Sequence, residues 1–380
     1  MTDFVFATAG RIVFGPGRAR DLPALVAGLG SRPFVCTGAH PERHAALLDT
    51  LGPDLAQWSV RGEPTVPEIQ AGVAAAREHR ADLVIGLGGG AVLDAAKLIA
   101  VLVRNPADLL DYAEVIGAGA PLGVPSLPTI AVPTTAGTGS EVTANGVVAS
   151  PEHEVKVSLR SPSMLPAVAL VDPELTLGCP PAITAASGLD ALTQCLEPFV
   201  SPAATPITDA LCAEGLRRVG SGLRRAYADG ADLDARTDLS LAALLSGMAL
   251  ANAKLGAVHG FAGGIGGLTG APHGAICAAL LAATCRTNLS ALSDLDPAHP
   301  ALGRYAAAGE FLSGERGTVP LLEWIEETVS LLQVPGLIGL GLPRERFAEA
   351  CEKAAAASSM KGNPVALDRE QLLGILEASA

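Results

Sequence analysis

The feature that most constrains the fold is a glycine-rich turn that follows an apolar run in the first quarter of the chain. In the stretch VIGLGGGAVLDAAKLIA, apolar residues lead into Gly86, Gly88, Gly89 and Gly90, and a helical pattern follows. Glycines let the backbone approach an anion, and N–H groups at a helix start favour a pyrophosphate. The turn predicts a dinucleotide or phosphate ligand. Because the usual G-x-G-x-x-G pattern is absent, a plain strand-to-helix turn that needs small residues fits the same spacing.

The first half of the chain alternates short β-branched runs with Ala-rich helical stretches. The expected strands are 11–14, 33–37, 81–87 and 129–132, with 147–148 and 155–159 as a β-hairpin. Thr65 and Glu68 have the spacing of a capping box, and Pro67 fits the first turn, so a helix is expected to begin there. Such alternation is typical of an α/β sheet that binds its ligand at the C-terminal edge.

The pattern changes after Pro180 and Pro181. Strand-like runs almost vanish, and long periodic Ala/Leu segments continue to the end of the chain. We therefore expect an α/β nucleotide-binding domain over residues 1–180 and an all-α domain over residues 181–380. Each is long enough for a hydrophobic core that needs no disulfide or metal to hold it.

Composition excludes several classes of function. The net charge of −13 and the small aromatic set of eight Phe, three Tyr and two Trp argue against a nucleic-acid groove. The seven cysteines are scattered without a C-x-x-C pair, which favours a reducing compartment. No signal-peptide pattern is visible, and no apolar run reaches the roughly 18 residues of a membrane span. The sequence predicts a cytoplasmic protein with neither nucleic acid nor membrane as a partner.

A second segment, VPTTAGTGSEVT, places hydroxyl side chains around two glycines after another apolar run. Hydroxyls and backbone amides at a sheet edge suit the ribose, adenine or phosphate oxygens of a nucleotide. The hydroxyl-bearing residues are Thr134, Thr135, Thr138, Ser140 and Thr143. An ordinary polar loop with a Ser/Thr helix cap is an equally open interpretation.

The helical half contains candidate metal ligands. Asp190 and Gln194 stand at i and i+4 on one helix face, and His259 and His273 lie on either side of a Gly-rich stretch that Pro272 interrupts. Two imidazoles, a carboxylate and an amide oxygen around a divalent ion would polarise an alcohol or carbonyl oxygen. Core histidines with ordinary hydrogen bonds, and an Asp190 that caps a helix, are the alternatives.

Four motifs together resemble the iron-dependent (group III) alcohol dehydrogenase family of the dehydroquinate synthase-like superfamily. They are GGGAVLDAAK, PTTAGTGSEVT, GLDALTQCLE and LGAVHGFAGGIGGLTGAPHGAICAALL, in the family's order. The likeness covers most of the chain. It implies an α/β nucleotide-binding domain followed by an all-α domain, an active site in the cleft between them, and a homodimer.

The resemblance also implies roles for single residues. Those expected at the pyrophosphate and nicotinamide end of NAD or NADP are Gly88, Gly89, Gly90 and Asp94. Those expected along the rest of the cofactor are Thr134, Thr135, Thr138 and Thr143, with Lys156 at a ribose hydroxyl. The four positions that would hold Fe²⁺ or Zn²⁺ are Asp190, Gln194, His259 and His273, of which Asp190, His259 and His273 are expected to be catalytic.

The chain departs from the family's pattern at four places. Gln194 stands where members usually carry His, so a strong nitrogen donor becomes a weak amide oxygen and the metal is expected to bind less tightly. Gly263 stands where a His often relays protons. Thr37 and Gly38 replace the acidic residue that commonly binds the adenosine ribose, which makes NADP plausible beside NAD. Ala91 replaces a frequent pyrophosphate-binding Ser.

The resemblance implies reversible hydride transfer between a nicotinamide and a small alcohol, aldehyde or ketone whose oxygen is polarised by a divalent metal. Two alternatives stay open because of Gln194. One is a metal-independent enzyme like the maleylacetate reductases. The other is a non-catalytic nucleotide-binding protein.

Overall fold

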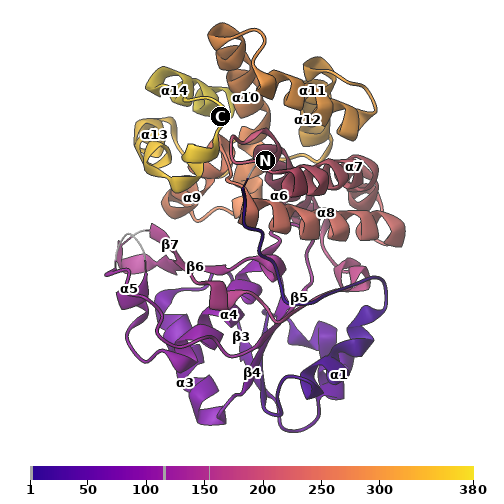
Figure 1. Cartoon of the computed structure of the whole chain (residues 1–380), viewed down its shortest axis with the longest axis vertical. Coiled ribbons are helices and arrows are strands. Elements are labelled where there is room, and N and C mark those ends of the chain that lie inside the picture. Colours follow the sequence, from indigo (N-terminus) through magenta and orange to yellow (C-terminus); the bar gives the residue numbers. More distant parts are fainter. Residues whose placement is uncertain (1–2, 114–116, 154) are drawn as a thin grey trace. The chain divides into compact units, whose positions relative to one another are not determined.

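The computed structural model describes residues 3–113, 117–153 and 155–380, with the side chain of Pro151 left aside. The chain divides into two compact units (Figure 1). The α/β unit comprises the described residues of 8–135 and 139–176. The helical unit comprises those of 1–7, 136–138 and 177–380. The main division thus falls at 176/177, and the short segment 136–138 belongs with the helices.

A six-stranded parallel sheet forms the centre of the α/β unit. In spatial order its strands are β1 (Ile12–Phe14), β8 (Val168–Val171), β5 (Thr129–Pro133), β4 (Leu83–Gly88), β2 (Pro33–Thr37) and β3 (Ala56–Ser59). From β2 the chain moves outward to β3 and then returns to β4 on the other side of β2. Ligands of open α/β sheets bind outside the carboxyl ends of the strands at such a reversal. The glycine turn follows β4 directly and therefore lies at this point, although it is not on the first strand.

Helices cover both faces of the sheet, which explains why its central strands β5, β4 and β2 are buried throughout. These helices are α1 (Leu22–Ala27), α2 (Ala45–Leu48), α3 (Val66–His79), α4 (Gly90–Arg104) and α5 (Leu109–Tyr112). Phe34 and Val84 pack with α3 and α4, whereas their neighbours Val35 and Ile85 pack with α1 and α2. Figure 1 shows α3 and α1 on opposite sides of the strands. Successive side chains of a strand point to opposite faces, so each face receives its own apolar layer.

The predicted elements of this unit are confirmed. The four expected strands are β1, β2, β4 and β5, and the expected hairpin is β6 (Asn145–Ser150) paired with β7 (Val155–Arg160). The capping box forms, because the Thr65 amide donates to Glu68 Oε2 at 2.9 Å and the Glu68 amide to Thr65 Oγ1 at 3.4 Å. Two strands were not predicted. β3 is a short edge strand whose side chains alternate between half-buried and exposed, and β8 has only four residues.

The helical unit contains only helices and their connections among the described residues from 177 onward. The helices are α6 (Pro181–Val200), α7 (Pro206–Ala228), α8 (Leu233–Asn252), α9 (Ala257–Thr269), α10 (His273–Leu295), α11 (Pro300–Ser313), α12 (Thr318–Leu331), α13 (Phe347–Ala356) and α14 (Arg369–Ala378). α6 packs against α7, α8 and α10, and its second half is buried throughout. The predicted fold class, an α/β unit followed by an all-α unit, is confirmed.

One helix passes a test for a possible membrane span, although polar residues interrupt its apolar sequence. Within the described residues, α10 passes that test by length and composition, and the bent pair α8 and α9 passes it only if taken as one span. In the structure 61% of the apolar window of α10 is buried. A buried core helix has the same composition, so this finding is weak evidence for a membrane span.

A buried lysine ties α4 to the segment that follows β5. Lys97 Nζ donates to the Ser140 carbonyl at 2.9 Å and to Thr143 Oγ1 at 3.0 Å, and lies 3.3 Å from Asp94 Oδ1. Asp94 in turn accepts from Ser140 Oγ at 2.5 Å and from the Val147 amide at 3.0 Å. The network therefore fixes the 3₁₀ turn η4 (Ser140–Val142) and the start of the hairpin on α4.

Glu141 lies beside this network, and its carboxyl group is buried. The residue is 2% exposed, and burial raises the pKa of its carboxyl from 4.5 to about 7 despite the nearby charge of Lys97. A carboxyl with a raised pKa makes the stability of the fold depend on pH.

Replacing Glu141 with Gln tests this dependence. Between about pH 4.5 and about pH 7 the unfolded chain releases a proton that the folded chain keeps, so the free energy of unfolding falls as the pH rises. Glu141→Gln removes this decline. The thermal midpoint of the variant relative to the native protein should therefore rise across that interval and level off above it, as measured by calorimetry. The exposed Glu78→Gln serves as the control, and a pH-independent difference for Glu141→Gln contradicts the prediction.

Candidate metal and cofactor sites

The glycine turn and the end of β5 meet at the start of α4. Gly89 is the N-cap of this helix, and no side chain caps it. A Cβ at Gly88 would lie 2.6 Å from Val92 Cγ2, so a larger residue there would clash with the helix. The Thr134 amide donates to the Gly88 carbonyl at 3.0 Å, and a Cβ at Gly89 would lie 3.4 Å from the Thr135 side chain. The backbone N–H groups of an uncapped helix start can receive a phosphate here.

The structure does not gather the other predicted cofactor residues at this turn. The side chains of Asp94 and Thr143 bind within the Lys97 network. Lys156 lies on β7 with its Nζ 3.4 Å from Glu63 Oε2. Thr138 belongs to the helical unit, whereas Thr134, Thr135 and Thr143 belong to the α/β unit. Contact of any of these six residues with a cofactor stays a prediction.

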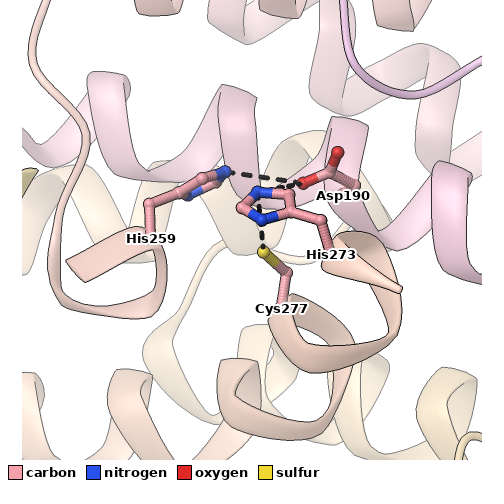
Figure 2. A group of neighbouring side chains, drawn as sticks. All are labelled: Asp190, His259, His273 and Cys277. Atoms are coloured by element: carbon pink, nitrogen blue, oxygen red, sulfur yellow. Dashed lines mark hydrogen bonds and ion pairs between the residues drawn. The ribbon is translucent and has the colours of Figure 1, made fainter. Parts of the chain in front are cut away.

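Four potential metal-binding side chains converge in the helical unit. Asp190 comes from α6, His259 from the first turn of α9, and His273 and Cys277 from the first two turns of α10. One ligand atom from each residue lies within 4.8 Å of all the others. Figure 2 shows the four side chains pointing toward one another. Asp190 Oδ1 is 3.4 Å from His259 Nε2 and 3.9 Å from His273 Nε2, and His273 Nε2 is 3.7 Å from Cys277 Sγ.

A glycine lets α10 approach α6 closely enough to form this cluster. A Cβ at Gly274 would lie 2.5 Å from the Ala186 carbonyl oxygen and 3.3 Å from Asp190 Cβ. Pro272 is the N-cap of α10, so His273 is the first helical residue and Cys277 follows one turn later on the same face. The Gly-rich, Pro-containing sequence around His273 therefore sets the position of two of the four side chains.

A buried glutamate that sequence reasoning missed orients His259. Glu197 Oε2 lies 2.7 Å from His259 Nδ1, and Glu197 Oε1 accepts from the Val258 amide at 2.7 Å at the start of α9. The carboxylate fixes the imidazole so that Nε2 faces the cluster, as carboxylate partners of metal-bound histidines do. A signal was present in the sequence, because residues 190, 194 and 197 share one face of an otherwise apolar helix.

Two buried atoms at the centre of the cluster have no hydrogen-bond partner. They are Asp190 Oδ1 and His259 Nε2, on side chains that are 2% and 5% exposed. Buried polar atoms almost always have partners, so this pair calls for an explanation such as an ion. A carboxylate oxygen, two imidazole nitrogens and a sulfur are suitable donors for a divalent transition metal. The residues present thus fit a metal site.

The charges of the cluster favour a cation. Burial acts to raise the pKa of Asp190, but the His259 imidazole, whose Nε2 lies 3.4 Å from Asp190 Oδ1, and the charge of His273 together lower it. The charge of Cys277 raises the pKa of His273 to about 9 against the effect of burial. Asp190 and Cys277 therefore attract positive charge, which protons on the imidazoles or a metal ion can supply.

Gln194 has different contacts from those of a ligand. Its Nε2 donates to Asp190 Oδ2 at 2.9 Å, and its Oε1 accepts from Ser246 Oγ at 2.9 Å. The amide thus holds the second oxygen of Asp190 and leaves Oδ1 directed at the cluster. At the relay position, Gly263 is exposed, and a Cβ there would have no neighbour within 4 Å.

Comparisons with known proteins agree with this architecture. Residues 9–173 match the family "Iron-containing alcohol dehydrogenase", and residues 184–380 match "Fe-containing alcohol dehydrogenase family, C-terminal". "Alcohol dehydrogenase 4" of Saccharomyces cerevisiae (strain YJM789) is 36% identical over 333 residues, which are 87% of this chain and 85% of the relative.

Two solved structures are similar over almost their whole length. The alcohol dehydrogenase from Oenococcus oeni has a TM-score of 0.90 at 31% identity, with 100% of each chain covered. The sulfoacetaldehyde reductase from Bifidobacterium kashiwanohense in complex with NAD+ has a TM-score of 0.86 at 27% identity, with 99% of this chain and 98% of that chain covered.

Enlarging Gly274 tests the close approach of α10 to α6. Gly274→Ala places a methyl group against the Ala186 carbonyl, so we expect a loss of about 1–3 kcal/mol in the stability of the helical unit and weaker metal binding. Gly303→Ala on α11 is the control, since a Cβ there meets nothing within 4 Å. It should leave stability unchanged or raise it by up to about 1 kcal/mol. Equal effects of the two substitutions in thermal unfolding contradict this packing argument.

Neutralising Glu197 tests its role behind His259. We expect Glu197→Gln to lower metal affinity about 10- to 100-fold while leaving the fold intact, because the amide keeps the shape but loses the charge that supports the imidazole. Competition with a chromogenic chelator measures the affinity, and far-ultraviolet circular dichroism checks the fold. The exposed Glu323→Gln on α12 removes one carboxylate elsewhere on the unit. An affinity that matches this control contradicts the assigned role.

Proposed function

The chain belongs to the iron-containing alcohol dehydrogenase family and is an oxidoreductase of the alcohol dehydrogenase type, and we propose the following reaction for it. The enzyme transfers hydride reversibly between NAD(H) or NADP(H) and a small alcohol, aldehyde or ketone. Its catalytic metal-binding residues are Asp190, His259 and His273. The observation that carries this proposal is that two buried atoms 3.4 Å apart, Asp190 Oδ1 and His259 Nε2, form no hydrogen bond. Their chemistry is that of a cation site, which is what an alcohol dehydrogenase of this family uses.

A divalent metal supplies Lewis-acid polarisation of the substrate oxygen, which favours the alkoxide from which hydride leaves. The residues of this chain do the rest. Asp190 provides the negative charge, and Gln194 keeps its carboxylate in one orientation. Glu197 holds the His259 ring, so little reorganisation is needed when the site is loaded. His273 has a side chain that is 37% exposed, and this is the side from which a small substrate reaches the cluster.

The nicotinamide cofactor is proposed to bind at the carboxyl ends of β2, β4 and β5. The uncapped start of α4, with Gly88, Gly89 and Gly90, receives the pyrophosphate, and Thr134 and Thr135 lie beside it. Gly38 follows β2, is exposed, and would have no neighbour within 4 Å of a Cβ. Since no carboxylate occupies positions 37 and 38, a 2′-phosphate is not repelled there, which supports use of NADP as well as NAD.

We further propose a cytoplasmic homodimer that carries Fe²⁺ or Zn²⁺. Six of the seven cysteines are buried free thiols, which suits a reducing compartment. The dimer rests on the likeness to the family. Two histidines and a carboxylate serve either metal.

Metal analysis combined with a substrate panel tests the proposed function. Purified protein should contain about one divalent metal ion per chain and oxidise or reduce members of a panel of small alcohols, aldehydes and ketones with NAD(H) or NADP(H). Removal of the metal by a chelator should lower kcat/KM about 100-fold or more, because a Lewis acid lowers the activation barrier by several kcal/mol. Added Fe²⁺ or Zn²⁺ should restore it.

The same experiment separates the alternatives. Full activity after chelation supports a metal-independent reductase like the maleylacetate reductases. Tight binding of NADH or NADPH without turnover of any member of the panel supports a non-catalytic nucleotide-binding protein. Either result contradicts the proposal.

A further inference from the structure

The metal cluster contains a sulfur atom that neither the motifs nor the family likeness assigns. Cys277 Sγ belongs to the group of donor atoms that lie within 4.8 Å of one another. The residue is 0% exposed and lies one turn after His273 on α10. The position expected to supply the fourth donor holds Gln194, and the oxygen of that amide accepts from Ser246 Oγ at 2.9 Å.

Three of the distances between neighbouring donor atoms are close to those of a tetrahedral site. Zinc bonds of about 2.0–2.3 Å to oxygen, nitrogen and sulfur place neighbouring tetrahedral donors roughly 3.3–3.8 Å apart. The corresponding distances are 3.4 Å for Asp190 to His259, 3.9 Å for Asp190 to His273 and 3.7 Å for His273 to Cys277. The remaining pairs of donor atoms lie within 4.8 Å, so the four side chains need only local adjustment to share one ion. Asp190 Oδ1 and His259 Nε2 are buried and form no hydrogen bond, which points independently to a ligand at the same place.

We propose that Cys277 replaces Gln194 as the fourth protein ligand, so that the metal is held by Asp190, His259, His273 and Cys277. This inference rests on the proposed function, since it concerns the metal of that reaction. On binding, the thiol gives its proton to solvent and its sulfur forms the bond to the metal. Gln194 becomes a positioning residue that holds Asp190 Oδ2.

The ligand change alters which metal the site prefers. Thiolate is a softer donor than an amide oxygen or an imidazole, and it favours Zn²⁺ over Fe²⁺. A site with one carboxylate and one thiolate also carries no net charge when a divalent ion is bound, whereas the Asp190, Gln194, His259 and His273 set leaves about one positive charge. Neutrality suits the buried position of the cluster.

Cobalt substitution tests the proposal in the full-length protein. Co²⁺-loaded native protein should show a near-ultraviolet sulfur-to-cobalt charge-transfer band, and X-ray absorption at the metal edge should report one sulfur neighbour at about 2.3 Å. Cys277→Ser should abolish the band, keep the visible cobalt bands from the remaining ligands, and weaken metal binding at least 10-fold. Cys285→Ser, another buried cysteine on α10, should retain the charge-transfer band. Gln194→Leu should retain it as well.

The outcomes separate this inference from the proposed function. Stoichiometric Co²⁺ without a charge-transfer band or a sulfur neighbour overturns the role of Cys277 and leaves the metal-dependent dehydrogenase intact. A protein that binds no divalent metal overturns both. If Cys277→Ser fails to fold, the charge-transfer band and the X-ray absorption of the native protein still decide the question.

Discussion

The functional part of the structure depends on one constraint, which is the burial of Asp190 inside an apolar helical core. An ionised carboxylate in such surroundings is destabilising by several kcal/mol unless charge and hydrogen bonds compensate it. Gln194 satisfies one of its oxygens, and the other faces two imidazoles and a thiol. The histidines, the close packing of α10 on α6 and the glutamate behind His259 can all be understood as consequences of supplying that second oxygen with positive charge.

Sequence reasoning was most successful where a local rule determines the structure. The capping box at Thr65 fixed the start of α3, and the glycine run after β4 marked a strand-to-helix turn. It failed for β3 and β8, which are short and carry no distinctive pattern. These two strands are defined by their pairing with neighbouring strands and not by a local sequence pattern. β8, for example, lies between β1 and β5 in the sheet.

The metal-binding side chains could be predicted from the sequence only where they lie in a recognisable motif. Asp190, His259 and His273 lie in motifs with a recognisable order, and the structure brings them together from three helices. Glu197 and Cys277 were missed because a single acid or thiol in an Ala-rich helix looks like a core residue until its neighbours are known. Asp94 and Thr143 have contacts that the sequence did not reveal, because both bind the buried Lys97, while their contact with a cofactor stays a prediction.

The central claim is that the buried donors of the helical unit share one metal ion, and anomalous scattering from a crystal of the purified protein tests it most directly. Data collected on both sides of the metal absorption edge should give a single strong peak within bonding distance of Asp190 Oδ1 and His259 Nε2. A difference map with no peak there, or a peak at a place remote from these two atoms, would contradict the account.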